Sequence, residues 1–362
     1  MKIAMLHKTL PFGRITRGGG VDHQIHSLAN ALVERGHRVT IHSLDPAPPE
    51  ARYEVKPLAV PPIFLRSKVL YQYALGWFFR QADLGDPDVL HAHGDDHFLG
   101  GSRPLVRTFY GTNLDEARWA RTWKRRVGCL LHAPLEALSA AKADVAVGIS
   151  RATMRRLPFV RGVIPCGVDL RRFRPGRAKS PIPAVLFVGG LDDRKRGRLL
   201  LEAFARTIRP ALPAAELWIV TADLPVDRPG VRWFGRLATQ DIIRLFQEAW
   251  VYASPSSYEG FGVPSIEAMA CGTPVVSTPN PGAREVLVEG AFGVLAPAPR
   301  FGRAVLELLG DAARRESLAE RGLARAREFS FDEVAARYED AYRLAIRRAG
   351  LRHGRHPRTG EA

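Results

Sequence analysis

Residues 254–278 read SPSSYEGFGVPSIEAMACGTPVVST, and this stretch decides the fold. Its EGFG segment at 259–262 predicts a flexible loop, because glycine adopts backbone angles that other residues avoid. Pro264 suits the first turn of a helix, which we expect over residues 265–271. Residues 273–277 then have the composition of a buried parallel strand. The stretch therefore predicts a loop, a helix and a strand in succession.

Two carboxylates of this stretch, Glu259 and Glu267, lie on the loop and inside the expected helix. The free amides and the positive dipole end at a helix start suit a diphosphate. Glu267 could accept hydrogen bonds from both hydroxyls of a ribose, and Glu259 could contact a sugar beyond the phosphates. Surface glutamates on an ordinary loop and helix are the simpler interpretation. A dinucleotide fingerprint fails, because residues 278–281 read TPNP where a ribose-binding acid should end the next strand.

The same stretch resembles the E-x-(F/G)-G-x-x-x-x-E signature of retaining glycosyltransferases of the GT-B fold, family 4, including the trailing EAMACGTPVV. The resemblance implies that Glu259 contacts the donor sugar as a catalytic residue and that Glu267 binds the nucleotide ribose. It also places the backbone of Phe261, Gly262 and Val263 beside the donor.

The composition describes a chain large enough for two domains, with 362 residues of which 46% are hydrophobic. A formal charge of +16 favours an acidic partner such as nucleic acid, an anionic membrane or a phosphorylated substrate. No zinc-finger spacing, RNP motif or heptad repeat supports nucleic acid. The chain starts as a strand and not as a signal peptide, no apolar run approaches the roughly 20 residues of a membrane span, and three distant cysteines fit a reducing cytoplasm. We expect a cytoplasmic protein.

The first domain begins with a strand over residues 2–6, a helix over 22–36 and a strand over 39–44, which together predict a parallel βαβ unit. The intervening glycines, among them Gly19 and Gly20, could let a phosphate approach the backbone, although a plain tight turn explains them nearly as well. The family resemblance favours a role in donor binding, since its members also carry a glycine loop before this helix.

Two histidines, His91 and His93, follow the next expected strand, and ligands of parallel sheets bind at the carboxyl ends of strands. No carboxylate or cysteine pattern completes a metal site with them, so we expect an acceptor or sugar pocket. Family members read T-x-H-G in the following segment, whereas this chain has Tyr110, whose phenol can donate or accept a hydrogen bond. We place Tyr110 in the same pocket.

The second domain opens with a strand that ends at Gly189 and Gly190, followed by a run of cations before the next helix. Family members place an arginine directly after the strand glycine and a lysine five residues later, both on the diphosphate. Lys195 matches the lysine, Gly190 stands where the arginine is expected, and we take Arg194 as the substitute. The resemblance thus implies Lys195 and Arg194 as catalytic cations, with Gly190 beside the donor.

Residues 116–131 have the spacing of one amphipathic helix, with an apolar side that includes Trp119 and Trp123 and a basic side with Arg118, Arg121 and Arg125. The favoured interpretation is a helix whose apolar side packs on the sheet. The alternative is an interfacial helix in peripheral contact with an anionic membrane.

Over the whole chain, the resemblance implies an α/β protein of GT-B architecture, with two doubly wound parallel-sheet (Rossmann-like) domains facing a cleft. We expect an acceptor-binding domain at 1–175, a nucleotide-sugar-binding domain at 176–335, a helix at 336–350 that crosses back to the first domain, and a basic, disordered tail at 351–362.

The reaction implied is transfer of a hexosyl group from a nucleoside diphosphate sugar to a hydroxyl acceptor (a glycolipid, a glycan or a small molecule), with retention and without a metal or a cofactor. The alternative is a non-catalytic nucleotide-sugar-binding or scaffold protein of the same fold, because Tyr110 and Gly190 depart from the family pattern. The sequence does not reveal the base, the sugar, the acceptor or the oligomeric state.

Overall fold

The computed structural model describes residues 1–11, 19–66, 68–99, 103–120, 122–225 and 227–352. The chain forms two compact units: unit 1 is Met1–Gly167 together with Phe331–Ala362, and unit 2 is Val168–Ser330. The divisions fall a few residues before the expected ones at 175 and 335. Most of the expected tail, residues 353–362, lies outside the described residues.

In the described part of the chain, unit 1 has a seven-stranded parallel sheet of order β3-β2-β1-β4-β5-β6-β7. Its strands are β1 (Lys2–Leu6), β2 (Arg38–Ser43), β3 (Glu54–Pro57), β4 (Val89–Ala92), β5 (Leu105–Phe109), β6 (Val145–Gly148) and β7 (Gly162–Val163). Its helices are α1 (Gly20–Glu34), α2 (Pro62–Arg66), α3 (Lys68–Gln81), α4 (Asn113–Arg118), α5 (Trp123–Lys142), α6 (Arg151–Arg156) and α14 (Phe331–Arg352).

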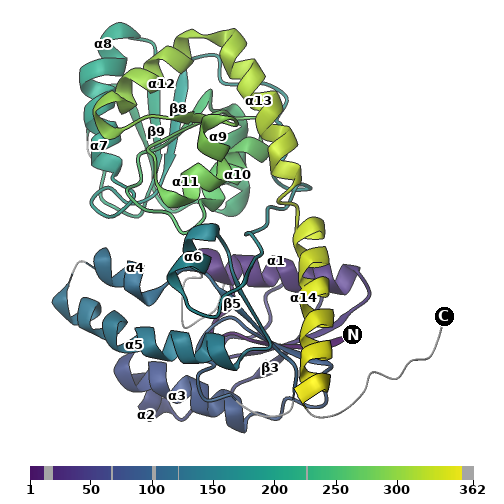
Figure 1. Cartoon of the computed structure of the whole chain (residues 1–362). Helices are drawn as coiled ribbons and strands as arrows, with labels where there is room; N and C mark the ends of the chain where they lie inside the picture. Colours follow the sequence, from purple (N-terminus) through teal and green to yellow (C-terminus); the bar gives the residue numbers. More distant parts are fainter. Residues whose placement is uncertain (12–18, 67, 100–102, 121, 226, 353–362) are drawn as a thin grey trace. The chain divides into compact units, whose positions relative to one another are not determined.

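Helices cover both faces of this sheet, as a doubly wound fold requires. Helices α1 and α14 pack on one face, where their apolar side chains meet β1, β2, β4, β5 and β6 (Figure 1). Helices α3 and α5 pack on the other face. Since the central strands are buried on both sides, most of their side chains are apolar, and the polar ones inside β4 and β5 (His91, Arg107 and Thr108) are hydrogen-bonded.

Helix α14 is fixed to unit 1 by charged groups as well as by its apolar face. The Glu339 carboxylate accepts hydrogen bonds from Arg35 Nε at 2.6 Å and from His37 Nε2 at 2.9 Å. The hydrogen bond from Arg35 is the main reason why the pKa of Glu339 falls to about 2. The helix expected at 336–350 therefore starts earlier, at Phe331, and belongs wholly to the first unit.

Among the described residues, unit 2 has a six-stranded parallel sheet of order β10-β9-β8-β11-β12-β13. Its strands are β8 (Ala184–Val188), β9 (Glu216–Val220), β10 (Val231–Phe234), β11 (Val251–Ser254), β12 (Val275–Ser277) and β13 (Val294–Leu295). Its helical segments are α7 (Gly197–Ala203), η1 (Phe204–Ile208), α8 (Arg209–Ala211), α9 (Thr239–Glu248), α10 (Val263–Ala270), α11 (Pro281–Val286), η2 (Val288–Gly290), η3 (Ala298–Arg300), α12 (Phe301–Gly310) and α13 (Ala312–Arg327).

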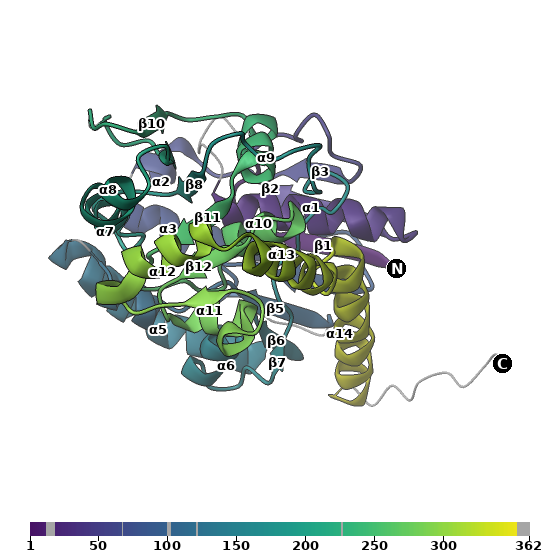
Figure 2. The ribbon, with the colours of Figure 1, turned by 90° about the horizontal axis from the view of Figure 1, so that it is seen from above.

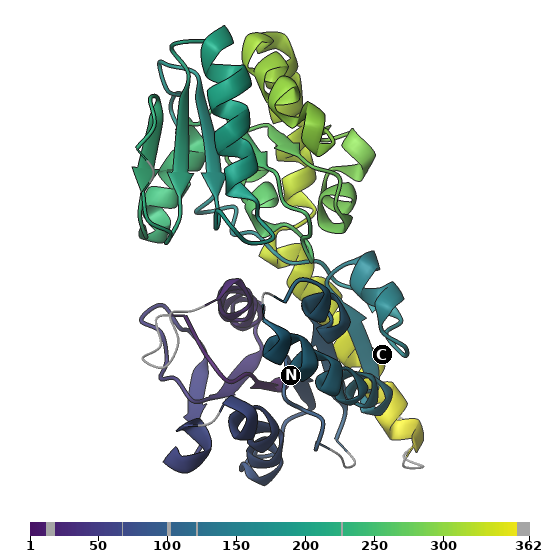
Figure 3. The same ribbon diagram turned by 90° about the vertical axis from the view of Figure 1, so that its left-hand side faces the viewer.

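The order of these strands can be followed in Figure 2, where β10, β8, β11 and β12 succeed one another across the sheet. Helices α7 and α12 pack on one face through a common apolar cluster (Figure 3). Helices α9 and α10 contact the strands β8, β11 and β12 and each other. The two doubly wound α/β units confirm the expected fold class.

One expected helix, at 116–131, is wrong in two respects. The segment is divided between α4 and α5, because Thr122 has an extended backbone and caps α5 by accepting a hydrogen bond from Arg125 N at 3.3 Å. Its apolar side is not packed on the sheet: Trp123 is 72% exposed and Leu131 is 62% exposed. The core contacts of α5 come instead from its later residues, such as Ala140. Arg121 lies outside the described residues.

Candidate functional site

The loop of residues 259–262 and helix α10 take the predicted conformation because two glycines permit it. Gly262 precedes α10 with a φ of 101°, in the left-handed region. Gly282 allows the loop to pack closely, since a Cβ there would lie 2.5 Å from the carbonyl oxygen of Phe261. This close approach helps to set where the backbone of Glu259 lies, since a Cβ at Gly282 would also lie 2.9 Å from the Glu259 carbonyl oxygen.

Phe261 was expected beside the donor, but the structure buries its side chain. It is 3% exposed, and its ring lies 5.4 Å from that of Phe329. Only its backbone can therefore face a ligand. Gly262 and Val263 stand at the start of α10, where the first amides of a helix have no partner within the helix.

The Glu259 carboxylate lies between the two cations that the sequence singled out. Its Oε1 lies 2.6 Å from Lys195 Nζ, and its Oε2 accepts a hydrogen bond of 3.0 Å from Arg194 Nη1. Arg194 Nη1 also donates to the carbonyl of Tyr258 at 3.0 Å. Burial opposes ionisation of Glu259, but Lys195 and Arg194 outweigh it and hold its pKa below the usual range. This cluster, Glu259 with Lys195 and Arg194, is called the unit 2 site below.

The turn after β8 brings Lys195 to this position. A Cβ at Gly189 would lie 2.9 Å from Lys195 Cγ, and a Cβ at Gly190 would lie 2.6 Å from Asp193 Oδ2. Gly189, with a φ of 153°, is the position that favours glycine, whereas at Gly190 a Cβ would require only the Asp193 side chain to move.

The other two cations of this run do not join the unit 2 site. Arg196 donates to the carbonyl of Pro255 at 2.6 Å and to Thr278 Oγ1 at 3.1 Å, so it ties the loop to the end of β12. Arg198 forms an exposed ion pair with Asp192. Only half of the basic run therefore faces Glu259.

Glu267 lies on α10 in a largely buried position. Burial raises the pKa of its carboxyl to about 7, and the charge of Lys195 opposes that shift only in part. The group is therefore close to half-ionised near neutral pH. A ligand that donates hydrogen bonds to this carboxyl favours its ionised form.

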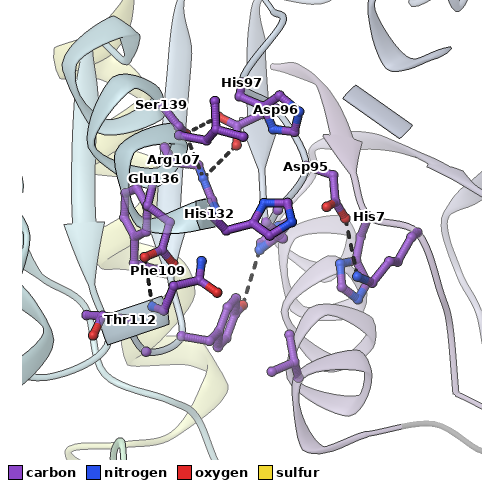
Figure 4. A pocket seen from close by; sticks show the side chains of 18 of the residues that line it. His7, Asp95, Asp96, His97, Arg107, Phe109, Thr112, His132, Glu136 and Ser139 are labelled. Atoms are coloured by element: carbon purple, nitrogen blue, oxygen red, sulfur yellow. Dashed lines mark hydrogen bonds and ion pairs between the residues drawn. The ribbon is translucent and has the colours of Figure 1, made fainter. Parts of the chain in front are cut away.

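In unit 1, a cavity of about 410 Å³ lies at the carboxyl ends of β1, β4 and β5, and residues of α5 form part of its wall (Figure 4). Figure 4 shows Asp96, Arg107 and Ser139 joined on one side of it, with His7 and Asp95 on the other. Arg107 Nε lies 2.8 Å from Asp96 Oδ1, and Ser139 Oγ donates to Asp96 Oδ2 at 2.6 Å. The volume is within the range of roughly 300–1,000 Å³ usual for small-molecule sites.

His91 does not line this cavity, contrary to expectation. It is fully buried, with Nδ1 2.8 Å from the Tyr342 hydroxyl and Nε2 2.8 Å from Thr108 Oγ1. Burial lowers its pKa to about 3, so it is a neutral core histidine. His93 and Tyr110 do line the cavity, and their Nδ1 and hydroxyl lie 3.2 Å apart. Burial raises the pKa of Tyr110 well above its usual range, so its phenol stays neutral.

Sequence reasoning missed a hydrogen-bonded pair in this cavity, His7 and Asp22. His7 Nε2 lies 2.8 Å from Asp22 Oδ1, and Asp22 also accepts from Thr9 Oγ1 at 2.9 Å and from Gly19 N at 2.5 Å. The spacing of these residues carries no motif. Gly19 and Gly20 begin α1 and are exposed, and the cavity wall contains neither.

Solved structures define the class of fold. The chain is similar to sucrose-phosphate synthase from Thermosynechococcus elongatus, with a TM-score of 0.78, 21% identity and coverage of 96% of this chain and 99% of that one. It is also similar to Anabaena HepE in complex with UDP-glucose, with a TM-score of 0.70, 17% identity and coverage of 94% and 99%. Both units thus have the architecture of GT-B glycosyltransferases.

Family models cover both units. The model described as "Glycosyltransferase Family 4" matches residues 18–172, and the one described as "Glycosyl transferases group 1" matches residues 182–311. The chain belongs to this family of glycosyltransferases.

Two curated relatives illustrate the range within the family. The D-inositol 3-phosphate glycosyltransferase of Segniliparus rotundus is 31% identical over 52% of this chain and 48% of the relative. The phosphatidyl-myo-inositol mannosyltransferase of Propionibacterium freudenreichii is 26% identical over 91% and 92%. The matches cover about half the length of several other curated relatives.

Proposed function

We propose that the chain transfers a hexosyl group from a nucleoside diphosphate sugar to a hydroxyl acceptor, with retention at the anomeric carbon. The observation that carries the proposal is the unit 2 site, where Lys195 and Arg194 both contact Glu259 beside the start of α10. Two cations around one carboxylate leave an excess of positive charge. That excess suits the diphosphate of a donor and the charge that develops on it as the sugar leaves.

The remaining donor contacts follow from this arrangement. The first amides of α10, at Gly262 and Val263, face the phosphates. The Glu267 carboxylate accepts hydrogen bonds from the ribose hydroxyls, and Glu259 contacts the sugar. The leaving phosphate takes the proton of the acceptor hydroxyl, so neither glutamate needs to act as a covalent nucleophile. Charge on the leaving group is offset by Lys195 and Arg194 without a metal or a cofactor.

We propose that the acceptor binds in the cavity of unit 1, whose wall includes His93 and Tyr110. The names of the two curated relatives above both include inositol, so inositol derivatives should be among the first acceptors tested.

The test is release of nucleoside diphosphate from a panel of nucleotide sugars, with and without acceptors, followed by NMR of the product to assign its anomeric configuration. Glu259→Ala should lower turnover strongly while free nucleoside diphosphate still binds. Binding without release from any donor would favour a nucleotide-sugar-binding protein. Inversion in the product would contradict the retaining mechanism.

We further propose that the exposed surface of α4 and α5 makes peripheral contact with an anionic membrane. No helix in the described ranges is long and apolar enough to cross a bilayer. The surface does combine apolar and basic groups, which suits a membrane interface. Its exposed apolar and basic members include Leu114, Arg118, Trp119, Trp123, Lys124, Arg125, Arg126, Val127, Leu130 and Leu131.

Co-sedimentation with anionic and neutral liposomes across a salt series tests this contact. Each cation near an anionic surface contributes about 1 kcal/mol, and the attraction fades over a Debye length of about 8 Å at physiological salt. The triple variant Arg118→Gln, Lys124→Gln, Arg126→Gln should lose binding to anionic liposomes, whereas Arg314→Gln on α13 should not. No binding of the unaltered protein at low salt would contradict the contact.

A further inference from the structure

The cavity of unit 1 holds more carboxylates than cations among its described residues. Its cations are Lys8 and Arg107, and its carboxylates are Asp22, Asp95, Asp96, Glu116 and Glu136. This balance is opposite to that of the unit 2 site, and it bears directly on the chemistry of an acceptor.

Both cations already face a carboxylate. Lys8 Nζ lies 3.4 Å from Asp95 Oδ2, and Arg107 Nε lies 2.8 Å from Asp96 Oδ1 in a buried ion pair. The Arg107 guanidinium is further fixed by Ser139 Oγ, which accepts from Arg107 Nε at 3.1 Å. A phosphate entering the cavity would therefore have to displace one of these carboxylates and approach the remaining ones, both of which are unfavourable.

His93 in the cavity wall carries a buried polar atom without a hydrogen-bond partner among the described residues. His93 is 6% exposed, its Nδ1 is engaged by the Tyr110 hydroxyl, and its Nε2 has no hydrogen-bond partner among the described residues. Burial lowers the pKa of His93 well below its usual range, so the ring is neutral and Nε2 is either a donor or an acceptor according to its tautomer. A hydroxyl can satisfy either form, whereas an ionised phosphate oxygen can satisfy only a donor.

We propose that this cavity binds the acceptor as an uncharged polyhydroxylated ring, a sugar or cyclitol without phosphate, with one hydroxyl on His93 Nε2. Further hydroxyls donate to the carboxyl groups of Asp95 and Glu136, the second of which also accepts a hydrogen bond of 2.8 Å from the backbone amide of Asn113. The inference rests on the proposed transfer reaction and adds the class of its acceptor. Carboxylates accept hydrogen bonds from hydroxyls strongly, which suits this class of ligand.

The experiment uses the full chain with the donor that gives the highest rate of nucleoside diphosphate release. Matched pairs of acceptors are compared: myo-inositol with its 3-phosphate, and D-glucose and D-mannose with their 6-phosphates. We expect at least a tenfold higher kcat/KM for a neutral member over its phosphorylated partner. A preference for the phosphorylated members would overturn the proposal.

The variant His93→Phe should raise the KM for the neutral acceptor about tenfold. The matched control is His23→Gln on the exposed side of α1, which should leave that KM unchanged. An unchanged KM in folded His93→Phe would overturn the contact. If that variant does not fold, the selectivity of the unaltered protein still decides. Absence of both donor hydrolysis and nucleotide binding would instead contradict the proposed function.

Discussion

The unit 2 site and the cavity of unit 1 use charged residues in opposite ways. In unit 2, Lys195 and Arg194 share one carboxylate, that of Glu259. In unit 1, Arg107 and Lys8 each have a carboxylate of their own, and further carboxylates line the wall. Both places lie beside parallel strands of a doubly wound sheet. The fold therefore determines where a site forms. The ratio of cations to carboxylates in the connecting loops then determines whether the site binds an anionic or an uncharged ligand.

The largest effect should follow from removing a cation of the unit 2 site. Lys195→Ala should lower turnover about a hundredfold to a thousandfold, the range for loss of one group that stabilises developing negative charge. Arg194→Ala should act in the same direction. Steady-state rates of nucleoside diphosphate release measure both. Arg198→Ala, which removes only an exposed ion pair with Asp192, is the control and should stay near the unaltered rate. Unchanged transfer in Arg194→Ala would leave Lys195 as the single diphosphate cation.

A smaller effect is expected from the ribose contact. Glu267→Ala should weaken binding of the nucleoside diphosphate by about 1.5–3 kcal/mol, because hydrogen bonds to a charged group are lost. Isothermal calorimetry measures the affinity, with Glu320→Ala on the exposed side of α13 as the control and circular dichroism to confirm folding. Equal affinities of the Glu267 and Glu320 variants would contradict a contact between Glu267 and the ribose.

The raised pKa of Glu267 predicts how this affinity depends on pH. The ribose hydroxyls donate to the ionised carboxylate, and free Glu267 ionises with a pKa of about 7. Below that pH a proton must leave before the ligand binds, so affinity should fall by up to about tenfold per pH unit, and above it the affinity should level off. Calorimetry from pH 5.5 to 8.5 follows the curve. Glu267→Gln should bind weakly and without this dependence, and a parallel slope in that variant would assign the titration to another group.

The raised pKa of Glu267 also makes the stability of the folded protein depend on pH. The pKa of Glu267 is higher in the folded state than the usual value of 4.5, so the contribution of this group to stability is full below about pH 4.5 and is lost as pH rises through about 7. Urea unfolding at pH 5 and pH 8 should therefore show Glu267→Gln gaining stability relative to the unaltered protein at the higher pH, by about 1–3 kcal/mol. An equal difference at both pH values would contradict a buried, partly protonated carboxyl.

The sequence predicted the unit 2 site better than the cavity of unit 1, for a physical reason. Glu259 and Glu267 stand on one short loop and helix, so their spacing fixes where they lie relative to α10. Lys195 could be assigned through the family pattern. Its contact with Glu259, however, depends on how closely the turn at Gly189 packs, and such packing is not visible in a sequence.

The cavity of unit 1 could be predicted only in outline. Strand ends indicated its position, but His7 and Asp22 come from different elements and have no motif. His91 and His93 look equivalent in the sequence. Their environments differ because β4 ends at Ala92. His91 therefore follows the alternation of side chains within the strand, whereas His93 lies beyond its end and does not. Periodicity in 116–131 likewise identified an apolar side without showing whether anything covers it.

The smallest expected effect would change the charge balance of the unit 1 cavity. Asp95 forms a half-exposed ion pair with Lys8, and its φ of 55° is one that asparagine adopts readily, so Asp95→Asn should fold without strain. An ion pair of this kind is worth about 0.2–1 kcal/mol, so removing the Asp95 carboxylate should improve binding of an anion in the cavity by no more than about fivefold. The measurement is inhibition by inorganic phosphate, competitive against the neutral acceptor, at a saturating donor concentration that keeps phosphate out of the unit 2 site. Asp241→Asn on the exposed side of α9 should leave the inhibition constant unchanged. If phosphate inhibited the unaltered protein as strongly as Asp95→Asn, the Asp95 carboxylate would not oppose anion binding, and the proposed difference in charge preference between the two sites would be contradicted.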